Sequence, residues 1–449
     1  MSTELVHEMN TAISLWLGEQ DIETAVFDAS TDELLEFANV LLCITRYHCV
    51  SNKNVNENFS FTANSALSGG AHPCASPECR MSKIEGLISF AALYADVVYI
   101  RNPFEYIALK SSAEIIEVDR HNLLAAIYVF IYLRPMIERG IISYAHDVNP
   151  FCDMHHNQIA LPLIEKINEK SDALAKNISE DLIDKCVVKF NSTNKKAPFF
   201  EIMGPSGLIE HGKVYYHPYN PMPPLFKRFR KKGPVYTLGK SEVEDSKVLS
   251  MVINPIVQDI MFQEWHTTLS GTSYLCDNGA HMGLVSTINN EVFKANSDAF
   301  QSSVGHYLPR IRARDPLVLL DIREREQEAF FVYRDKLRKI INNRWSEREL
   351  AEVFRDEIQP EINIINKKIR DWKTNSRQSL GEKLLFGTGS VTLGLYAGIL
   401  PPNIGQIVAA LGGVSAAAGI LLDWNKTLKD KQQARASDFF FLWEAASGK

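Results

Sequence analysis

The longest uncharged stretch of the chain is residues 384–422, LLFGTGSVTLGLYAGILPPNIGQIVAALGGVSAAAGILL. Asp, Glu, Lys and Arg make up 23% of the chain, so a run of this length would rarely arise by chance. Two apolar arms, Leu384–Leu400 and Gln406–Leu422, flank the segment Pro401–Gly405. Proline lacks the N–H group that a helix needs, and glycine lets the chain turn. The stretch therefore predicts a glycine-rich apolar helical hairpin.

Small residues in both arms would let the two helices pack closely: Gly394, Gly398, Gly412, Gly413 and Gly419. Close packing of this kind pairs apolar helices in a bilayer and in a protein interior. At about 1.5 Å per residue each arm reaches only ~25 Å, short of the ~30 Å hydrocarbon core of a membrane. Lysines flank the stretch, which would keep both ends on one side of a membrane. Two alternatives follow: a re-entrant hairpin that contacts a membrane, or a buried hairpin that forms an oligomer interface.

Composition restricts the class of protein. The 449 residues suffice for two or three domains, and 45% hydrophobic residues provide sizeable cores, which excludes wholesale disorder. The formal charge of −6 argues against a general nucleic-acid coat. Seven irregularly spaced cysteines indicate reduced thiols, and the N-terminus has no apolar signal segment. We expect a cytoplasmic protein, peripheral at the inner membrane if the hairpin contacts lipid.

The N-terminal third alternates helices with short strands. Ser30 and Glu33 form a capping box, which predicts a helix start. Helix patterns over 81–94 and 121–138 precede the strand-like segments Asp96–Ile100 and Gly140–Tyr144, which predicts a small α/β layer. Residues 51–72 are rich in Asn, Ser and Gly and are predicted to form a loop.

The chain from residue 160 onward has a different pattern of predicted elements. Residues 160–195 are predicted to be mostly helical, and the segments 213–216 and 234–238 are strand-like. From Asp315 a charged helical neck leads to the hairpin, with an apolar stripe at helical spacing. We predict a mainly α protein with an α/β N-terminal portion, α+β overall. Its parts are an N-terminal domain (1–165), an irregular α+β middle region (166–310), and a neck with hairpin (311–449).

One candidate site is a structural zinc centre. Cys74 and Cys79 lie on a proline-rich segment, and Cys152 and His155 form a second close pair. Zinc takes four such ligands at tetrahedral angles, usually as two short-spaced pairs. The alternative interpretation is that these are ordinary loop residues and buried thiols. If zinc binds here, a closed site with four protein ligands would serve folding rather than catalysis.

A second candidate is a basic tract with two aromatic residues, Phe226 and Phe229. Its cations are Lys227, Arg228, Arg230, Lys231 and Lys232. Such a tract could bind phosphates of nucleic acid or anionic lipid headgroups, with the aromatic rings stacking on bases or inserting into the interface. The alternative is a solvated surface loop.

No catalytic residue is nominated. The chain has no nucleophile elbow, zinc-protease motif, phosphate loop or dinucleotide fingerprint. Asp96 at the start of one predicted strand and Asp147 after another could form a carboxylate pair for a divalent ion. Carboxylates at strand ends are also common turn residues, so enzyme activity stays open.

Three segments carry a resemblance: Leu93–Pro103 (LYADVVYIRNP), Leu133–Ile142 (LRPMIERGII) and Asp321–Leu337 (DIREREQEAFFVYRDKL). They resemble large uncharacterised bacterial proteins, some of which are suspected of roles in phage defence. The glycine-rich hairpin is similar to the C-terminal ends of those proteins. The resemblance implies a bacterial defence or stress role and brings no activity or catalytic residue with it.

We therefore expect a bacterial protein whose front portions sense a cue and whose C-terminal hairpin self-associates or engages an anionic membrane. Its partners would be further copies of itself or another protein, with nucleic acid as a further alternative at residues 227–232. The rival classes are a metal-dependent hydrolase or nuclease and a non-enzymatic adaptor subunit with a buried hairpin interface.

Overall fold

The computed structural model describes residues 2–48, 60–70, 72, 77–145, 161–194, 198–204, 214–216, 224–270, 272–276, 305–307, 311–312, 317–325, 327–328, 330–331, 385–386 and 392–396. Its helices are α1 (Ser2–Leu17), α2 (Ile22–Asp28), α3 (Thr31–His48), α4 (Pro77–Tyr94), α5 (Glu105–Ala108), the 3-10 turn η1 (Ser112–Glu114), α6 (Glu117–Glu138), α8 (Leu161–Ile183), α9 (Pro224–Arg230), α10 (Lys240–Ser246), α11 (Val248–Ser270) and α13 (Leu317–Arg325). Its strands are β1 (Ser60–Ala63), β2 (Val97–Ile100), β3 (Ile142–Tyr144), β4 (Val187–Asn191), β5 (Phe199–Met203), β6 (Val214–Tyr216), β7 (Val235–Thr237), β8 (Ser273–Cys276), β9 (Gly305–Tyr307), β10 (Ile311–Arg312), β11 (Leu385–Phe386) and β12 (Thr392–Tyr396). This part of the chain is mainly helical with three sheets, which agrees with the α+β prediction.

The capping box predicted at Ser30 is confirmed. The Ser30 N–H donates to Glu33 Oε2 at 2.7 Å, and the Glu33 N–H donates to Ser30 Oγ at 3.2 Å. Helix α3 begins there and buries one face: Leu34, Phe37, Ala38, Leu41, Leu42 and Thr45. Helix α1 packs beside α3, where the rings of Trp16 and Phe37 stack at 4.0 Å between centroids.

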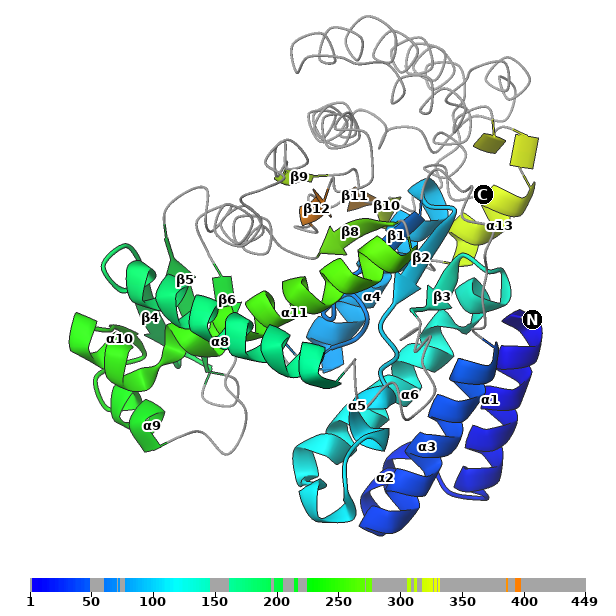
Figure 1. Cartoon of the computed structure of the whole chain (residues 1–449), viewed down its shortest axis with the longest axis horizontal. Coiled ribbons are helices and arrows are strands. Elements are labelled where there is room, and N and C mark those ends of the chain that lie inside the picture. Colours follow the sequence, from blue (N-terminus) through cyan, green and yellow to red (C-terminus); the bar gives the residue numbers. More distant parts are fainter. Residues whose placement is uncertain are drawn as a thin grey trace, which may run out of the picture.

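A six-stranded sheet in the order β3-β2-β1-β8-β12-β9 is the centre of the larger part of the molecule (Figure 1). Strand β1 pairs in parallel with both β2 and β8, and β2 pairs in parallel with β3. Strand β12 runs antiparallel to β8 and to β9. The chain moves outward from β1 to β2 and β3, then returns to the other side of β1 as β8. The strand order therefore reverses between β1 and β8.

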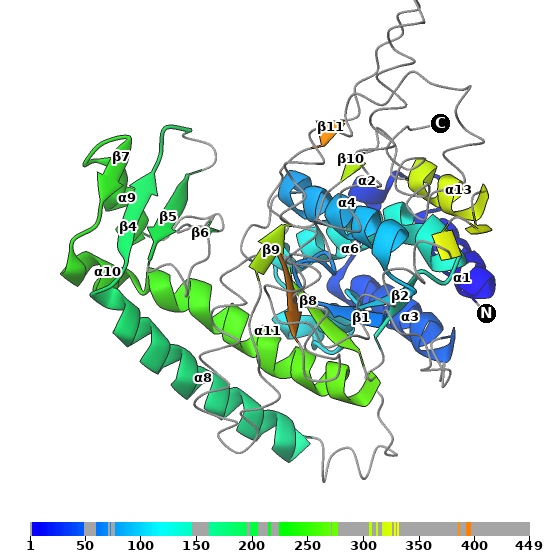
Figure 2. The same cartoon turned by 90° about the horizontal axis from the view of Figure 1, so that it is seen from above.

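Helices cover both faces of this sheet. Right-handed crossovers place α4 and α6, which link β1 to β2 and β2 to β3, on one face. Figure 2 shows these helices on one side of the strands and α11, which contacts β1 and β8, on the other. All four residues of β1 are buried, as expected for a parallel strand covered on both faces.

Both strands predicted in the N-terminal third are confirmed as β2 and β3, and the helices before them as α4 and α6. The prediction of a loop over residues 51–72 is wrong at residues 60–63, which form β1, the strand with β2 on one side of it and β8 on the other. Residues 64–70 form the turn after β1, as predicted. The polar residues of β1 are not typical of a buried strand. Thr62 can be buried because its hydroxyl forms a hydrogen bond with the Thr272 hydroxyl, 2.5 Å away.

The segment between β3 and β8 forms a separate lobe. Helix α8 leads away from the main sheet, α11 returns beside it, and a four-stranded antiparallel sheet, β6-β5-β4-β7, lies at their far end (Figures 1 and 2). The predicted strands at 213–216 and 234–238 are its β6 and β7, which confirms them. The lobe core centres on three buried rings, Phe190, Phe200 and Phe229.

The C-terminal prediction needs one correction. Within the first arm of the expected hairpin, Leu385–Phe386 and Thr392–Tyr396 are strands, so the predicted helix does not extend through these residues. In β12, Gly394 lies between Cys276 of β8 and Gly305 of β9, and Leu395 and Tyr396 also pair with β8. Strand pairing satisfies the backbone here, and glycine is a poor helix former. Gly398, Gly412, Gly413 and Gly419 lie outside the described residues, as does most of the neck beyond α13.

Two hydrophobic clusters hold the described residues together. One consists of buried side chains from α1, α3, α4, α6 and the parallel strands. It also includes Leu275 of β8, Leu320 of α13 and Phe330. The other belongs to the lobe. The division at residues 165 and 310 stays a prediction. No helix within the described ranges is long and apolar enough to cross a membrane.

Candidate functional site

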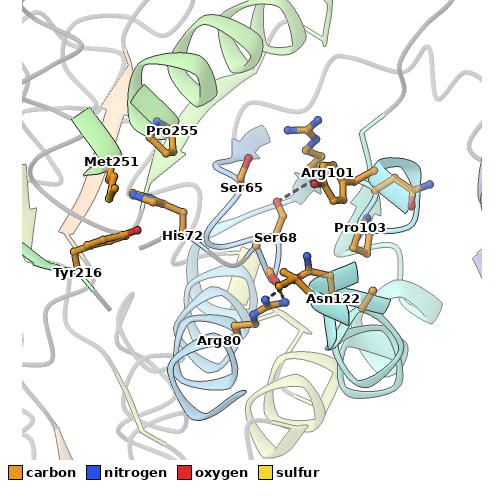
Figure 3. Close-up of a pocket in the computed structure, with 16 residues that line it drawn as sticks. Ser65, Ser68, His72, Arg80, Arg101, Pro103, Asn122, Tyr216, Met251 and Pro255 are labelled. Carbon is orange, nitrogen blue, oxygen red and sulfur yellow. Dashed lines mark hydrogen bonds between the residues drawn. The ribbon is translucent and has the colours of Figure 1, made fainter. Parts of the chain in front are cut away.

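A cavity of about 550 Å³ lies at the carboxyl ends of β1 and β2. Its walls come from the turn after β1, the residues after β2, helices α4 and α6, and, from the lobe, β6 and α11 (Figure 3). This edge adjoins the point where the strand order reverses, and doubly wound sheets bind their ligands in that crevice. The volume falls within the roughly 300–1,000 Å³ of small-molecule sites.

The turn after β1 is built by its own hydrogen bonds. Asn64 Oδ1 accepts from the Leu67 N–H at 3.0 Å, and Asn64 O accepts from the Ser68 N–H and Oγ–H. The Gly69 N–H donates to Ala66 O, and the Gly70 N–H donates to Ser65 O at 2.7 Å. Most amides of the turn are therefore used within it. A ligand would be held here by side chains, not by a cradle of backbone N–H groups.

Two glycines make this turn possible. Gly69 has φ +91°, a conformation that L side chains rarely adopt, and a Cβ there would lie 2.9 Å from Val129 Cγ2. A Cβ on Gly70 would lie 2.5 Å from Ser65 O, the atom that accepts its N–H. Side chains at either position would force the turn out of place.

Asp259 of α11 ties this turn to the lobe. Its carboxylate accepts from the Ser65 N–H at 3.2 Å and 3.1 Å, and from the Ser65 hydroxyl. Asp259 is only 7% exposed. A buried carboxylate that accepts several hydrogen bonds holds its donors in place. The tether therefore sets the distance between the turn and α11 at the mouth of the cavity.

Two arginines supply the positive charge of the cavity. Arg80 of α4 is buried, and its guanidinium donates to Asn122 Oδ1 at 2.7 Å and to Gly69 O at 3.5 Å. Arg101 follows β2 directly, and its N–H donates to Ser68 Oγ at 3.0 Å. The Arg101 side chain lies beside Ser65 at the cavity (Figure 3). Of the described residues that line the cavity, none is Asp or Glu.

The opposite wall is apolar and aromatic. Figure 3 shows Tyr216, Met251 and Pro255 gathered on the lobe side of the cavity, with His72 between them and the turn. The rings of His72 and Tyr216 are 6.2 Å apart between centroids. Burial raises the pKa of Tyr216, so its phenol stays protonated at neutral pH. The cavity thus has a cationic end and an aromatic end.

Only one of the four predicted zinc ligands lies among the described residues. Cys79 lies in α4, and Cys74, Cys152 and His155 lie outside the described part. No group of three potential metal ligands occurs among the residues that the structure places. A zinc centre stays a prediction.

The basic tract forms the helix α9 and the turn after it. Its cations lie on the surface, but Phe229 is buried against Phe190 and Phe200, so this ring is not available to stack on bases. Lys232 is engaged, because Glu242 and the Tyr236 hydroxyl accept from its ammonium group. Anion binding at Lys227, Arg228, Arg230 and Lys231 stays a prediction.

Asp96 precedes β2 and therefore lies at the amino edge of the parallel strands, away from the cavity. Asp147 lies outside the described residues. The carboxylate pair therefore stays a prediction.

Sequence analysis missed this cavity. A usable signal was present: a short run with a buried Phe and Thr, then Asn-Ser-x-x-Ser-Gly-Gly, then a helix (residues 60–94). The fold and the cavity define a mainly helical α+β protein with a cavity at the carboxyl edge of its main sheet. Comparison with protein-family models, with curated proteins and with solved structures found no match to this chain.

Proposed function

We propose that the chain binds a small molecule that carries a phosphate or similar anionic group, and that the cavity after β1 and β2 is the site. One observation carries this proposal. Arg80 and Arg101 lie at the cavity, and none of its described lining residues is acidic. Arginine is well suited to bind phosphate and carboxylate, because its planar guanidinium donates two parallel hydrogen bonds.

The two arginines have different roles in this proposal. Arg80 is already engaged by Asn122 and the Gly69 carbonyl, so it positions the turn and contributes charge from behind it. Arg101 lines the cavity and is less buried than Arg80, so it is the residue that would contact the ligand. Ser68 and Asn122 add polar groups between them.

This binding role is compatible with the sensing role expected for the front portions of the chain. The bacterial defence or stress role, with self-association or membrane engagement near the C-terminus, stays a prediction that rests on the sequence alone. The same holds for the hydrolase and adaptor alternatives.

The test is isothermal titration of the full-length chain with inorganic pyrophosphate and ribose 5-phosphate. We expect both to bind, and Arg101→Ala to weaken them about 10- to 100-fold, since a hydrogen bond to a charged group contributes about 1.5–3 kcal/mol. Thermal melts of each variant verify that the fold is intact.

Arg228→Ala is the matched control, because it removes an exposed arginine from the surface of α9. It should leave affinity within twofold. If the control weakens binding and Arg101→Ala does not, the basic tract is the anion site and the proposal fails. Failure of both compounds to bind would also overturn it.

A further inference from the structure

The aromatic end of the cavity belongs to the lobe. Tyr216 lies on β6, and Met251 and Pro255 lie on α11, whereas the arginines belong to the main sheet and its helices. A ligand that fills the cavity would therefore contact both parts of the molecule at once, with different chemistry at each end (Figure 3).

The lobe wall is suited to a flat ring. Tyr216 is buried within the lobe core, where it lies 6.5 Å from the Phe200 ring in a stacked arrangement, so its own ring is held in place. A fixed aromatic face binds a planar ring at low entropic cost, and stacking of a base on such a face contributes about 1–3 kcal/mol. Met251 and Pro255 extend this surface with apolar contacts.

The opposite side of the cavity carries the positive charge. Arg80, Arg101, Ser68 and Asn122 offer hydrogen-bond donors there, beside apolar lining from Pro103, Tyr106 and Val118. A molecule complementary to both ends has a planar ring at one end and an anionic group at the other.

We propose that the ligand is a nucleoside phosphate, with its base against Tyr216, Met251 and Pro255 of the lobe and its phosphate at Arg101. This inference rests on the proposed function and adds the ligand class and its orientation. It also gives the lobe a role in binding, because the lobe supplies the wall that recognises the base.

The experiment compares ribose 5-phosphate with the four common 5′-ribonucleoside monophosphates by isothermal titration of the full-length chain. The nucleotides should bind about 10- to 100-fold more tightly than ribose 5-phosphate, because only they have a base to stack. Tyr216→Leu should remove most of that difference while ribose 5-phosphate binding stays within twofold. Leucine keeps an apolar side chain at this buried position.

Tyr236→Leu is the matched control, since Tyr236 lies on β7 of the same lobe and packs on Phe229 rather than at the cavity. It should leave nucleotide affinity within twofold. Equal losses in both variants would mean that the lobe as a whole was weakened, which overturns the assignment of Tyr216.

The remaining outcomes separate the two proposals. If ribose 5-phosphate and the nucleotides bind equally well to the wild-type chain, the nucleoside inference fails and anion binding stands. If Tyr216→Leu weakens all compounds equally, the ring is structural and the inference fails. If none of the compounds binds, both proposals fail.

Discussion

Replacing Gly69 by alanine should unfold the turn that lines the cavity. The expected loss of unfolding free energy has a backbone contribution and a steric contribution. The position has φ +91°, and holding an L residue in a left-handed conformation costs about 1–2 kcal/mol. The added Cβ would also meet Val129 Cγ2 at 2.9 Å and Cγ1 at 3.2 Å. Val129 is 1% exposed in α6, so it cannot move aside freely, and overpacking of this kind costs about 1–3 kcal/mol. We expect Gly69→Ala to lose about 2–5 kcal/mol of unfolding free energy, the sum of the two contributions.

Gly140→Ala isolates the backbone contribution. Gly140 follows α6 with φ +69°, and a Cβ there would meet no atom within 4 Å. Only the conformational cost remains, about 1–2 kcal/mol. Urea unfolding followed by circular dichroism measures both variants, and the difference between them is the steric contribution from Val129.

A double-mutant cycle then tests the contact itself. Val129→Ala removes the methyl groups that the new Cβ would meet, so Gly69→Ala should cost about 1–3 kcal/mol less in that background than in the wild type. Strict additivity of the two substitutions would refute the steric argument. Equal costs for Gly69→Ala and Gly140→Ala would refute it as well.

Four further predictions concern other contacts. Asp259→Asn should cost about 1–3 kcal/mol and weaken ligand binding, because a neutral amide oxygen accepts weaker hydrogen bonds from the two Ser65 donors than a carboxylate does; unchanged melting would contradict this. Phe229→Ala should cost about 3–5 kcal/mol in urea unfolding, since this ring is 1% exposed; a surface-like loss below 0.5 kcal/mol would show that it is not core. Asn254→Leu should raise stability by about 1 kcal/mol, because Asn254 Oδ1 is buried without a hydrogen-bond partner among the described residues; a loss would reveal a partner. The Lys232 ammonium, the Gly239 N–H and the Tyr236 hydroxyl lower the pKa of Glu242 from 4.5 to about 2, so its stabilisation is present above pH 4.5 and is lost as the pH falls toward 2. Solvent screening reduces that contribution to about 1 kcal/mol, so Glu242→Gln should lose about this amount at pH 7 and nothing at pH 2.

Local signals in the sequence predicted the elements that depend on local chemistry. The capping box at Ser30 and Glu33 forms as its spacing requires, and the strands at β2 and β3 follow their β-branched and aromatic residues. The same reasoning failed at β1, because its short run of Ser, Phe, Thr and Ala carries little hydrophobic signal. Pairing with strands on both sides decides that segment, and such pairing is not a local property.

The helix prediction for residues 392–396 of the C-terminal apolar stretch is wrong for a related reason. Residues 392–396 contain Thr, two Leu, Gly and Tyr, which suit a strand as well as an apolar helix. The absence of charge makes the whole apolar run resemble one helical hairpin, whereas pairing with β8 and β9 determines the conformation of these five residues.

The cavity itself could not be read from spacing along the chain. Ser65 and Asp259 are 194 residues apart, yet the contact between their side chains joins the turn after β1 to the helix that leads into β8. The reversal of strand order explains why residues so far apart in the sequence are in contact. It places β8 next to β1 only after the chain has built two further strands and the lobe, so the lobe returns along α11 directly over the carboxyl end of β1. The turn there needs glycine at two positions, because a Cβ on Gly69 would meet Val129 and a Cβ on Gly70 would meet the Ser65 carbonyl. The cationic end and the aromatic wall therefore meet because of the topology, and a substitution that moves α11 should change ligand binding even when it touches no lining residue.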